Sequence, residues 1–270
     1  LAFAWANLLE AVLIAAGLVA MYRAQGGAMR AWRWEGATAA GLLREAWPLL
    51  FSALAAMIYA RIDQVMLGQI IDSAAVGVYA TAVRLAEAWY FLGGAIISSV
   101  FPFVVSARKV SEQLYLERLR RLYEVLVILS LAAALVLSVA ADSVITVAFG
   151  SDYAESAQVL IYLAWAGLPV LLGGASNQYL IAERLASIAM YRTILGALLN
   201  VVLNALWIPR YGLEGAAAAS LLAYVTATFS ILLFRPSARH GLVLVRCLLP
   251  VGLLLQLGRL VKSYLPSRRR

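Results

Sequence analysis

The chain is divided into apolar stretches of about twenty residues or more, the length that a helix needs to cross a lipid bilayer. Eight such stretches can be placed, at residues 1–22, 47–70, 77–105, 122–149, 156–181, 187–208, 214–234 and 241–261. Only 13% of the residues are charged, roughly half the share in a soluble domain. Because backbone polar groups in lipid must be satisfied within the spanning segment, the sequence predicts an all-α, multi-pass membrane protein.

Lysine and arginine are unevenly distributed over the connections between these segments. Nearly all of the loop Lys and Arg lie in one set of connections, near 23–46, 106–121, 182–192 and 235–246. The opposite set carries only Arg210. Positive charges are retained on the cytoplasmic side of a membrane, so we place the first set in the cytoplasm. Membrane topology therefore explains the net charge of +8, and nucleic acid is not expected as a partner.

The two ends and the first linker need separate interpretation. The chain begins at Leu1 within an apolar segment and lacks a basic leader, so we interpret it as part of a longer chain rather than as a signal peptide. Segment 241–261 is expected to be an additional C-terminal membrane segment. A full crossing would put the final arginines outside, against the positive-inside rule. The segment could instead re-enter the membrane, lie along its interface, or be followed by a further helix that this sequence lacks. Linker 23–46 is expected to be cytoplasmic, either interfacial or unstructured.

Four charged residues fall inside consecutive predicted membrane segments. Arg61 and Asp63 lie in the second segment, and Arg84 and Glu87 lie in the third at a similar depth. The first two are two residues apart and point in nearly opposite directions, whereas the second two share a helical face. Charges in hydrocarbon usually face one another or a cavity. Two interpretations remain. The four residues form an ion-pair network that fixes the helical hairpin, or they line a cavity in which an arginine contacts an anion and the carboxylates carry cations.

Uncharged or isolated polar residues are weaker candidates for a site. Asn200 and Asn204 lie four apart and share a helical face, and two more amides are adjacent in a predicted segment. Such side chains commonly form hydrogen bonds between membrane helices, and this is the interpretation that we favour. The candidates of lower weight are Glu10, Asn177, Gln178, Asn200 and Asn204.

Several kinds of chemistry are not expected from this sequence. Cys247 is the only cysteine and His240 the only histidine, so neither an intrachain disulfide nor a Cys/His metal site can form. The phosphate-binding loop G-x-x-x-x-G-K-[ST] does not occur, so ATP hydrolysis by that mechanism is not expected. No long outer loop carries clustered catalytic side chains, so we assign no catalytic residue and no resident cofactor or metal.

One part of the sequence resembles a known family of membrane transporters. The resemblance is carried by Y-A-R-I-D-Q at 59–64 within 47–68, by 76–90, and by Phe101-Pro102. These residues resemble the polysaccharide and lipid-linked oligosaccharide flippases of the multidrug/oligosaccharidyl-lipid/polysaccharide exporter superfamily. The later run at 208–217 looks like the same family, and the match covers most of residues 47–230.

The resemblance implies an architecture and a set of cavity residues. It implies two bundles of six helices around a central cavity that opens alternately to each side of the membrane. Residues 1–22 would be the last helix of the first bundle, and 47–234 would form the second bundle. The residues that match the family pattern and are expected to line the cavity are Arg61, Asp63, Gln64, Arg84 and Glu87.

The function that the resemblance implies is lipid flipping. The substrate would be a polyprenyl-pyrophosphate-linked oligosaccharide, moved to the outer leaflet of the cytoplasmic (cell inner) membrane for surface polysaccharide biosynthesis. Coupling to H⁺ or Na⁺, or to the membrane potential, would replace ATP. A polysaccharide polymerase, glycosyltransferases and membrane lipids are the expected partners. A multidrug or small-molecule cation antiporter with an acidic site at Asp63, Glu87 and Glu10 is the alternative, and a membrane enzyme of glycan assembly is a third.

Overall fold

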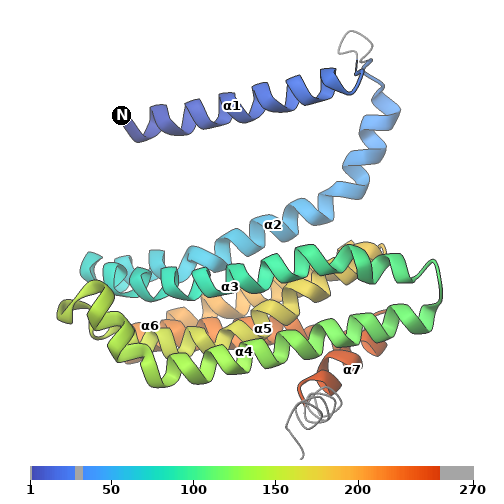
Figure 1. Ribbon diagram of the computed structural model, residues 1–270. Coiled ribbons are helices and arrows are strands. Elements are labelled where there is room, and N and C mark those ends of the chain that lie inside the picture. The colour runs from blue at the N-terminus through green and yellow to red at the C-terminus, as the bar shows by residue number, and fades with distance from the viewer. Residues whose placement is uncertain (1, 28–32, 250–270) are drawn as a thin grey trace, which may run out of the picture. The chain divides into compact units, whose positions relative to one another are not determined.

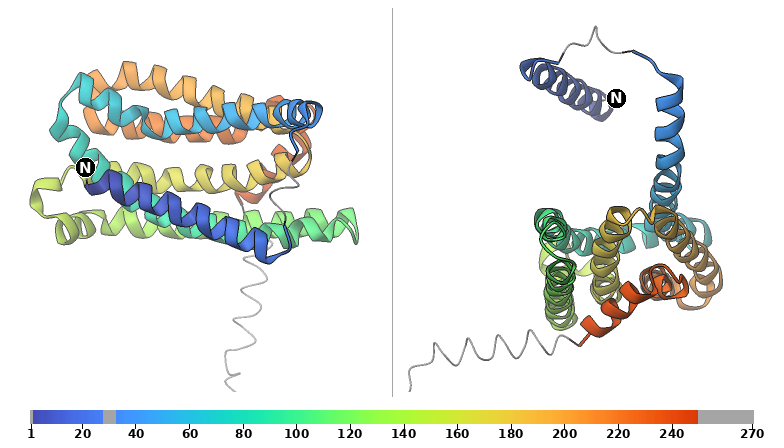
Figure 2. Two further views of the ribbon diagram at one scale, coloured as in Figure 1. Left: turned by 90° about the horizontal axis from the view of Figure 1, so that it is seen from above. Right: turned by 90° about the vertical axis from the view of Figure 1, so that its right-hand side faces the viewer.

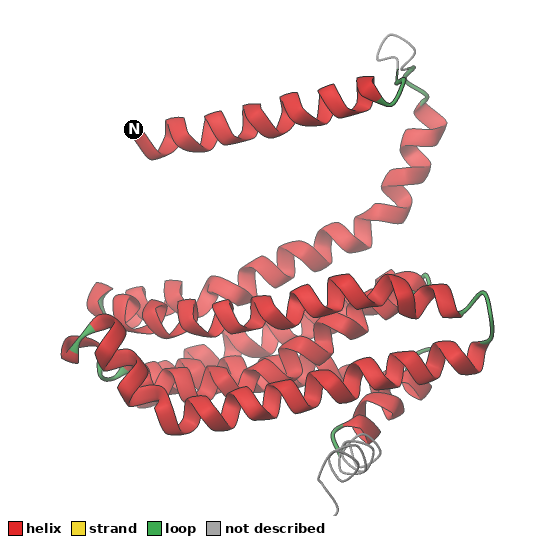
Figure 3. Ribbon diagram, viewed as in Figure 1, coloured by secondary structure: helices red, strands yellow, loops and turns green. Residues whose placement is uncertain are grey.

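The structure is a computed structural model that describes residues 2–27 and 33–249. Helices joined by short connections make up almost all of this part of the chain (Figure 3). The elements are α1 (Ala2–Ala24), α2 (Gly36–Ile70), α3 (Ser73–Ala107), α4 (Glu112–Phe149), η2 (Ser151–Tyr153), α5 (Ser156–Ala182), α6 (Ala186–Phe229), η3 (Ser230–Leu233) and α7 (Ala238–Cys247). Six described helices have the length and apolar composition to cross a membrane. The predicted all-α, multi-pass class is confirmed.

The chain divides into two compact units, Leu1–Trp47 and Pro48–Arg270. The first unit contains α1, on which large apolar side chains such as Leu9 and Leu13 are more than half exposed. An apolar surface of this kind suits contact with lipid or with another helix. Helix α2 begins at Gly36, so an unstructured linker is wrong for residues 36–46, where Ala and Leu favour helix.

Helix α5 is the central element of the second unit, because it packs against α3, α4 and α6. Helices α3 and α4 run antiparallel and side by side, as Figures 1 and 2 both show. Two side chains fix the helix starts at these connections. Asp72 accepts a hydrogen bond from the backbone N–H of Ala75 at the start of α3, and Ser111 accepts one from Leu114 at the start of α4.

Helix α6 is a hairpin of two antiparallel arms rather than one straight helix. Gly212 has φ 57° and ψ −133°, a conformation that favours glycine. The arms approach closely, because a Cβ built on Gly196 would lie 2.7 Å from the Cβ of Ala227, and one on Gly215 would lie 2.6 Å from the carbonyl oxygen of Trp207. Small residues permit this packing. The two arms, 186–211 and 213–229, correspond to the separate segments predicted at 187–208 and 214–234.

The two ends of the second unit differ in charge as the loop analysis predicts. The connections that precede α3 and α5 and join the arms of α6 surround one pocket, whose acidic residues are Asp72, Asp152, Glu155 and Glu214. The connections that follow α3 and α5 carry Arg108, Lys109 and Arg184, and Arg108 forms an ion pair of 2.6 Å with Glu183. The acidic end is therefore the outer end if the positive-inside rule holds.

The short helix α7 packs against α4 and η3. It lies at an angle to the long helices (Figure 2). It begins three residues before the predicted segment 241–261, and residues 250–261 of that segment lie outside the described part of the chain. Its buried side chains include His240, Leu244 and Cys247. This contact attaches α7 to the bundle through both polar and apolar groups.

Candidate functional site

Two of the four charged candidates form an ion pair between α2 and α3. A terminal guanidinium nitrogen of Arg61 lies 3.2 Å from the carboxylate of Glu87, with side chains 57% and 45% exposed. Arg84 is also exposed and forms no ion pair with any described residue. Asp63 is only 4% exposed. Arg61 and Asp63 thus point to different surroundings, as their two-residue spacing predicts.

The carboxylate of Asp63 accepts hydrogen bonds from three uncharged groups. The hydroxyl of Tyr79 on α3 donates at 2.6 Å, and the hydroxyl of Ser220 on the second arm of α6 donates at 3.3 Å. The backbone N–H of Gln64 donates at 2.7 Å. Within the part of the chain that the structure describes, no Lys, Arg or His forms an ion pair with Asp63. The carboxylate is therefore buried with hydrogen bonds but without a positive partner.

The network continues from Ser220 into the first arm of α6. The amide nitrogen of Asn200 donates to the Ser220 hydroxyl at 3.3 Å, and that of Asn204 donates to the Asn200 amide oxygen at 3.1 Å. Both asparagines are fully buried. We favoured hydrogen bonding between helices as the role of this pair. Asn200 has that role, because its hydrogen bond to Ser220 joins the two arms of the hairpin. The two amides extend the polar interior that begins at Asp63.

Two atoms beside this network are buried without a hydrogen-bond partner among the described residues, the amide oxygen of Asn204 and the amide nitrogen of Gln64. A buried polar atom without a partner costs about 1–3 kcal/mol. An isolated ionised carboxylate in such surroundings costs more, and it is stabilised by a proton or by a nearby cation. The arrangement around Asp63 can therefore hold either one.

The remaining sequence candidates do not join this network. Glu10 is exposed on α1, in the other compact unit. Gln178 is exposed on α5. Asn177 is half-buried and lines a separate cavity of about 290 Å³ between α2, α5 and α6.

Arg192 is a candidate that the sequence analysis missed. It was counted with the cytoplasmic loop 182–192, but it lies inside α6 and is only 4% exposed. Its terminal nitrogens donate to the Ser176 hydroxyl at 3.2 Å and to the Gly173 carbonyl at 2.8 Å, and it lines the same cavity as Asn177. The loop assignment is wrong because charge counting cannot tell an arginine that reaches the interface from one that turns inward. The signal was present, since the predicted segment 187–208 already included this position.

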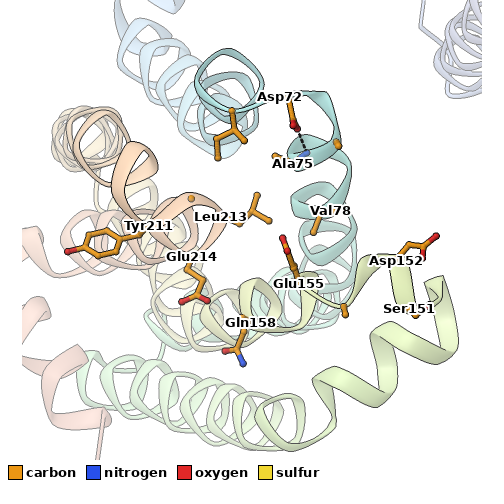
Figure 4. A pocket seen from close by; sticks show the side chains of 14 residues that line it. Asp72, Ala75, Val78, Ser151, Asp152, Glu155, Gln158, Tyr211, Leu213 and Glu214 are labelled. Carbon is orange, nitrogen blue, oxygen red and sulfur yellow. Dashed lines mark hydrogen bonds between the residues drawn. The ribbon is translucent and has the colours of Figure 1, made fainter.

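A wider pocket of about 800 Å³ lies at the acidic end of the second unit. In Figure 4 the carboxylate of Glu155 points into the space between α3 and the second arm of α6. The carboxylate of Asp72 is held at the start of α3 by its hydrogen bond to Ala75. Carboxylates at this end produce a negative potential where the pocket opens.

His240 sits in a buried aromatic cluster near Arg192. Its ring stacks on that of Tyr179 at 3.6 Å between centroids, and its Nε2 lies 3.0 Å from the hydroxyl oxygen of Tyr123. Burial, together with the positive charge of Arg192, lowers the pKa of His240 from 6.5 to about 3. The imidazole is therefore neutral in the folded protein at neutral pH and does not balance a negative charge.

Comparison with known proteins identifies the family. Residues 1–158, more than half of the chain, match the family described as polysaccharide biosynthesis protein. The chain belongs to this family. The match includes α1, α2, α3 and α4, and so covers Arg61, Asp63, Arg84 and Glu87. The resemblance inferred from the sequence is confirmed.

A curated relative is the probable low-salt glycan biosynthesis flippase of Haloferax volcanii. It is 26% identical over 178 residues, which are 66% of this chain and 38% of the relative. The chain thus spans less than half of the length of that relative.

Solved structures of transporters share the fold. The lipid II flippase MurJ in an inward closed conformation matches with a TM-score of 0.60 at 15% identity, over 83% of this chain and 50% of MurJ. A MOP superfamily transporter from Pyrococcus furiosus matches with a TM-score of 0.59 at 23% identity, over 82% of this chain and 52% of the transporter. A MATE transporter in the bent conformation gives 0.58 at 21% identity, over 70% and 43%. The chain therefore has the fold of about half of such a transporter.

Proposed function

We propose that the chain is part of a cation-coupled flippase that moves a lipid-linked oligosaccharide across the cytoplasmic membrane for surface polysaccharide biosynthesis. The protein works by alternating access, without ATP hydrolysis, and is a transporter rather than an enzyme. Glycosyltransferases supply its substrate and a polysaccharide polymerase consumes the product. Family membership and the name of the Haloferax volcanii relative support this proposal.

The observation that carries the coupling mechanism is the burial of Asp63 without a positive partner. Helix α2 supplies the carboxylate, α3 the Tyr79 hydroxyl and α6 the Ser220 hydroxyl. Loading this carboxylate with a cation changes the charge at the point where three helices meet. A ligand shifts a conformational equilibrium when it binds one state better than the other. Cation binding at Asp63 therefore favours one arrangement of these helices over another.

The coupling cation in this proposal is H⁺ or Na⁺. Protonation needs only the carboxylate. Na⁺ binding would use oxygen ligands, which hard cations prefer, and the chain offers the Asp63 carboxylate and the Ser220 hydroxyl, whose oxygens lie 3.3 Å apart. The donor set fits either ion, and a transport assay with imposed ion gradients separates them.

The exposed charges of α2 and α3 supply the face that meets the substrate. Arg84 has no carboxylate partner among the described residues, whereas Arg61 forms an ion pair with Glu87. Arginine binds phosphate through its fork of N–H donors. In the proposed flippase, Arg84 contacts the diphosphate of the lipid-linked substrate, while the Arg61–Glu87 pair opens and reforms as the cavity changes sides.

A second candidate is a multidrug or small-molecule cation antiporter. The shared fold with MATE transporters and the acidic residue Asp63 favour it. Such a protein would bind a cationic drug where the flippase binds an anionic lipid.

Gene deletion in the source organism tests the proposal. Loss of the flippase should remove surface polysaccharide and cause lipid-linked oligosaccharide to accumulate in the inner leaflet, and complementation with the intact gene should reverse both. Unchanged surface glycan, together with new sensitivity to cationic drugs, would instead identify the antiporter. Unchanged glycan and unchanged drug resistance would exclude both functions.

A further inference from the structure

Arg192 is a buried cation for which the described part of the chain provides no carboxylate. The side chain is 4% exposed and lies in α6, about 9 Å beyond the start of the helix at 1.5 Å per residue. None of the ion pairs among the described residues includes it. Its two hydrogen-bond acceptors, the Ser176 hydroxyl and the Gly173 carbonyl, are uncharged.

These two acceptors use only two of the five N–H donors of the guanidinium. One hydrogen bond from each terminal nitrogen is accounted for within the chain. Arg192 lines the 290 Å³ cavity, so its other N–H donors have space in which to bind a ligand. This volume is just below the range of small-ligand sites, about 300–1,000 Å³. The cavity therefore suits a compact ligand or the head of a longer one.

The rest of the cavity is lined by polar and apolar residues, with no carboxylate. The polar lining consists of Ser52, Tyr59, Asn177, Arg192, Thr193, Tyr224 and Thr228. The hydroxyls of Ser52 and Thr193 lie 3.4 Å apart, which joins α2 to the first arm of α6 at the cavity wall. The rings of Tyr59 on α2 and Tyr224 on the second arm of α6 lie 4.8 Å apart. The hydroxyls of Thr193 and Thr228 already donate to backbone carbonyls. An anion with several oxygens would meet the donors that remain in the described lining, which come from three helices: Tyr59, Asn177, Arg192 and Tyr224.

The nearby imidazole carries no charge. His240 is neutral at neutral pH, for the reason given above. An uncompensated arginine in low-dielectric surroundings exerts a stronger field than it would in water. The part of the cavity beside Arg192 is therefore electropositive, and charge-assisted hydrogen bonds to phosphate oxygens are among the strongest that a protein forms.

We propose that Arg192 and the polar residues around it form a binding site for a phosphate or diphosphate group, inside the second compact unit and separate from the Asp63 network. Two sources share this chemistry, the head group of a lipid phosphate or diphosphate and a free inorganic oxyanion. Asp63 is one helical turn beyond Tyr59 on α2 and does not line the cavity, so the cation network and this site are distinct. The inference rests on the geometry of this unit and does not require the transport activity proposed above.

The test measures binding to the purified full chain in nanodiscs of phosphatidylcholine, a lipid without net charge. Inorganic phosphate, inorganic diphosphate and farnesyl diphosphate are titrated separately by calorimetry. Arg192→Gln should weaken binding about tenfold or more, since it removes a charge-assisted hydrogen bond to the bound anion. Arg192→Lys should retain part of the affinity. Arg210→Gln, which removes the same charge from an exposed position on the same helix, should leave affinity unchanged.

The outcomes separate the sources and can overturn the proposal. Tighter binding of farnesyl diphosphate than of diphosphate, lost in Arg192→Gln, assigns a lipid head group. Equal affinities, lost in the same variant, assign a free oxyanion. If Arg192→Gln does not fold, Arg192→Lys and Asn177→Leu should each weaken binding at least severalfold relative to Arg210→Gln. Failure of all three ligands to bind, or equal loss in Arg210→Gln, shows that the site does not exist.

Discussion

Asp63 and Arg192 carry opposite charges, and each is stabilised by uncharged groups rather than by an ion pair. Tyr79 and Ser220 donate to the carboxylate, and Ser176 and the Gly173 carbonyl accept from the guanidinium. Burial of an unpaired charge is expensive, so proteins seldom keep one without a ligand to bind. At the residue scale, these two side chains are therefore the ones to which we assign ligands in the proposals above, whereas Arg61 and Glu87 form an ion pair with one another.

The coupling energy of the Arg61–Glu87 pair depends on whether the pair is exposed to water or to lipid. Both side chains are about half exposed, and a pair exposed to water contributes less than about 1 kcal/mol, decreasing with salt. A double-mutant cycle with Arg61→Ala and Glu87→Ala, measured by thermal unfolding at low and high salt, should give a coupling energy of this size. A salt-independent coupling of several kcal/mol would mean that the pair faces lipid, and the proposal that this face meets the substrate would be wrong.

His240 predicts an acid-sensitive contact between α7 and the bundle. Its pKa is about 3 when folded and 6.5 when unfolded, so the unfolded chain takes up a proton first as pH falls. The stability that the neutral ring provides is complete above pH 6.5 and is lost between pH 6.5 and 3, at up to about 1.4 kcal/mol per pH unit. The melting temperature should fall across this range in the native protein.

The control is His240→Phe, which keeps a ring against Tyr179 but cannot bind a proton. Its melting temperature should depend less on pH than that of the native protein. Equal pH dependence in both proteins would show that His240 is not the titrating group.

At the element scale, the α6 hairpin depends on the glycine at its turn. Gly212 has φ 57° and ψ −133°, and residues with a Cβ are strained there by about 1–3 kcal/mol. Gly212→Ala should therefore lower the melting temperature of the purified protein. Gly77→Ala is the matched control, because a Cβ on Gly77 meets nothing within 4 Å and α3 is regular there. If the two variants melt alike, the turn is not strained as described.

Sequence patterns predicted the elements better than they predicted side-chain partners. Apolar length located the helices, and the run Ile208-Pro209-Arg210-Tyr211-Gly212 marked the division between the arms of α6. The start of α2 was not predicted, because residues 36–46 are helix formers without the apolar length of a membrane segment.

The site was predicted in part. The charges of α2 and α3 were found, since any charge in a long apolar run is conspicuous. Tyr79 and Ser220 were not found, because a hydroxyl in such a run is common and only its tertiary contact with Asp63 distinguishes it. Arg192 was missed for a related reason, since its position near a segment end suits the interface as well as the interior.

At the scale of the whole molecule, the proposed cation site and the cavity beside Arg192 lie in one six-helix bundle. Helices α3, α4, α5 and the two arms of α6 pack together, and α2 joins them through the hydrogen bonds of Ser52 and Asp63. The chain spans about half of the transporters that share its fold, so the proposed transport cycle involves more protein than these residues. Helices α2, α3 and α6 meet at Asp63, and a cation bound there acts on all three.

The measurement that tests this claim most directly is substrate flipping in membrane vesicles from cells that carry the complete gene, under an imposed Na⁺ or pH gradient. Native protein should respond to one of the two gradients. Asp63→Asn, which keeps the shape and removes the charge, should lose that response by about tenfold or more, while Arg210→Gln keeps it. Gradient-driven flipping that persists unchanged in Asp63→Asn would contradict the account.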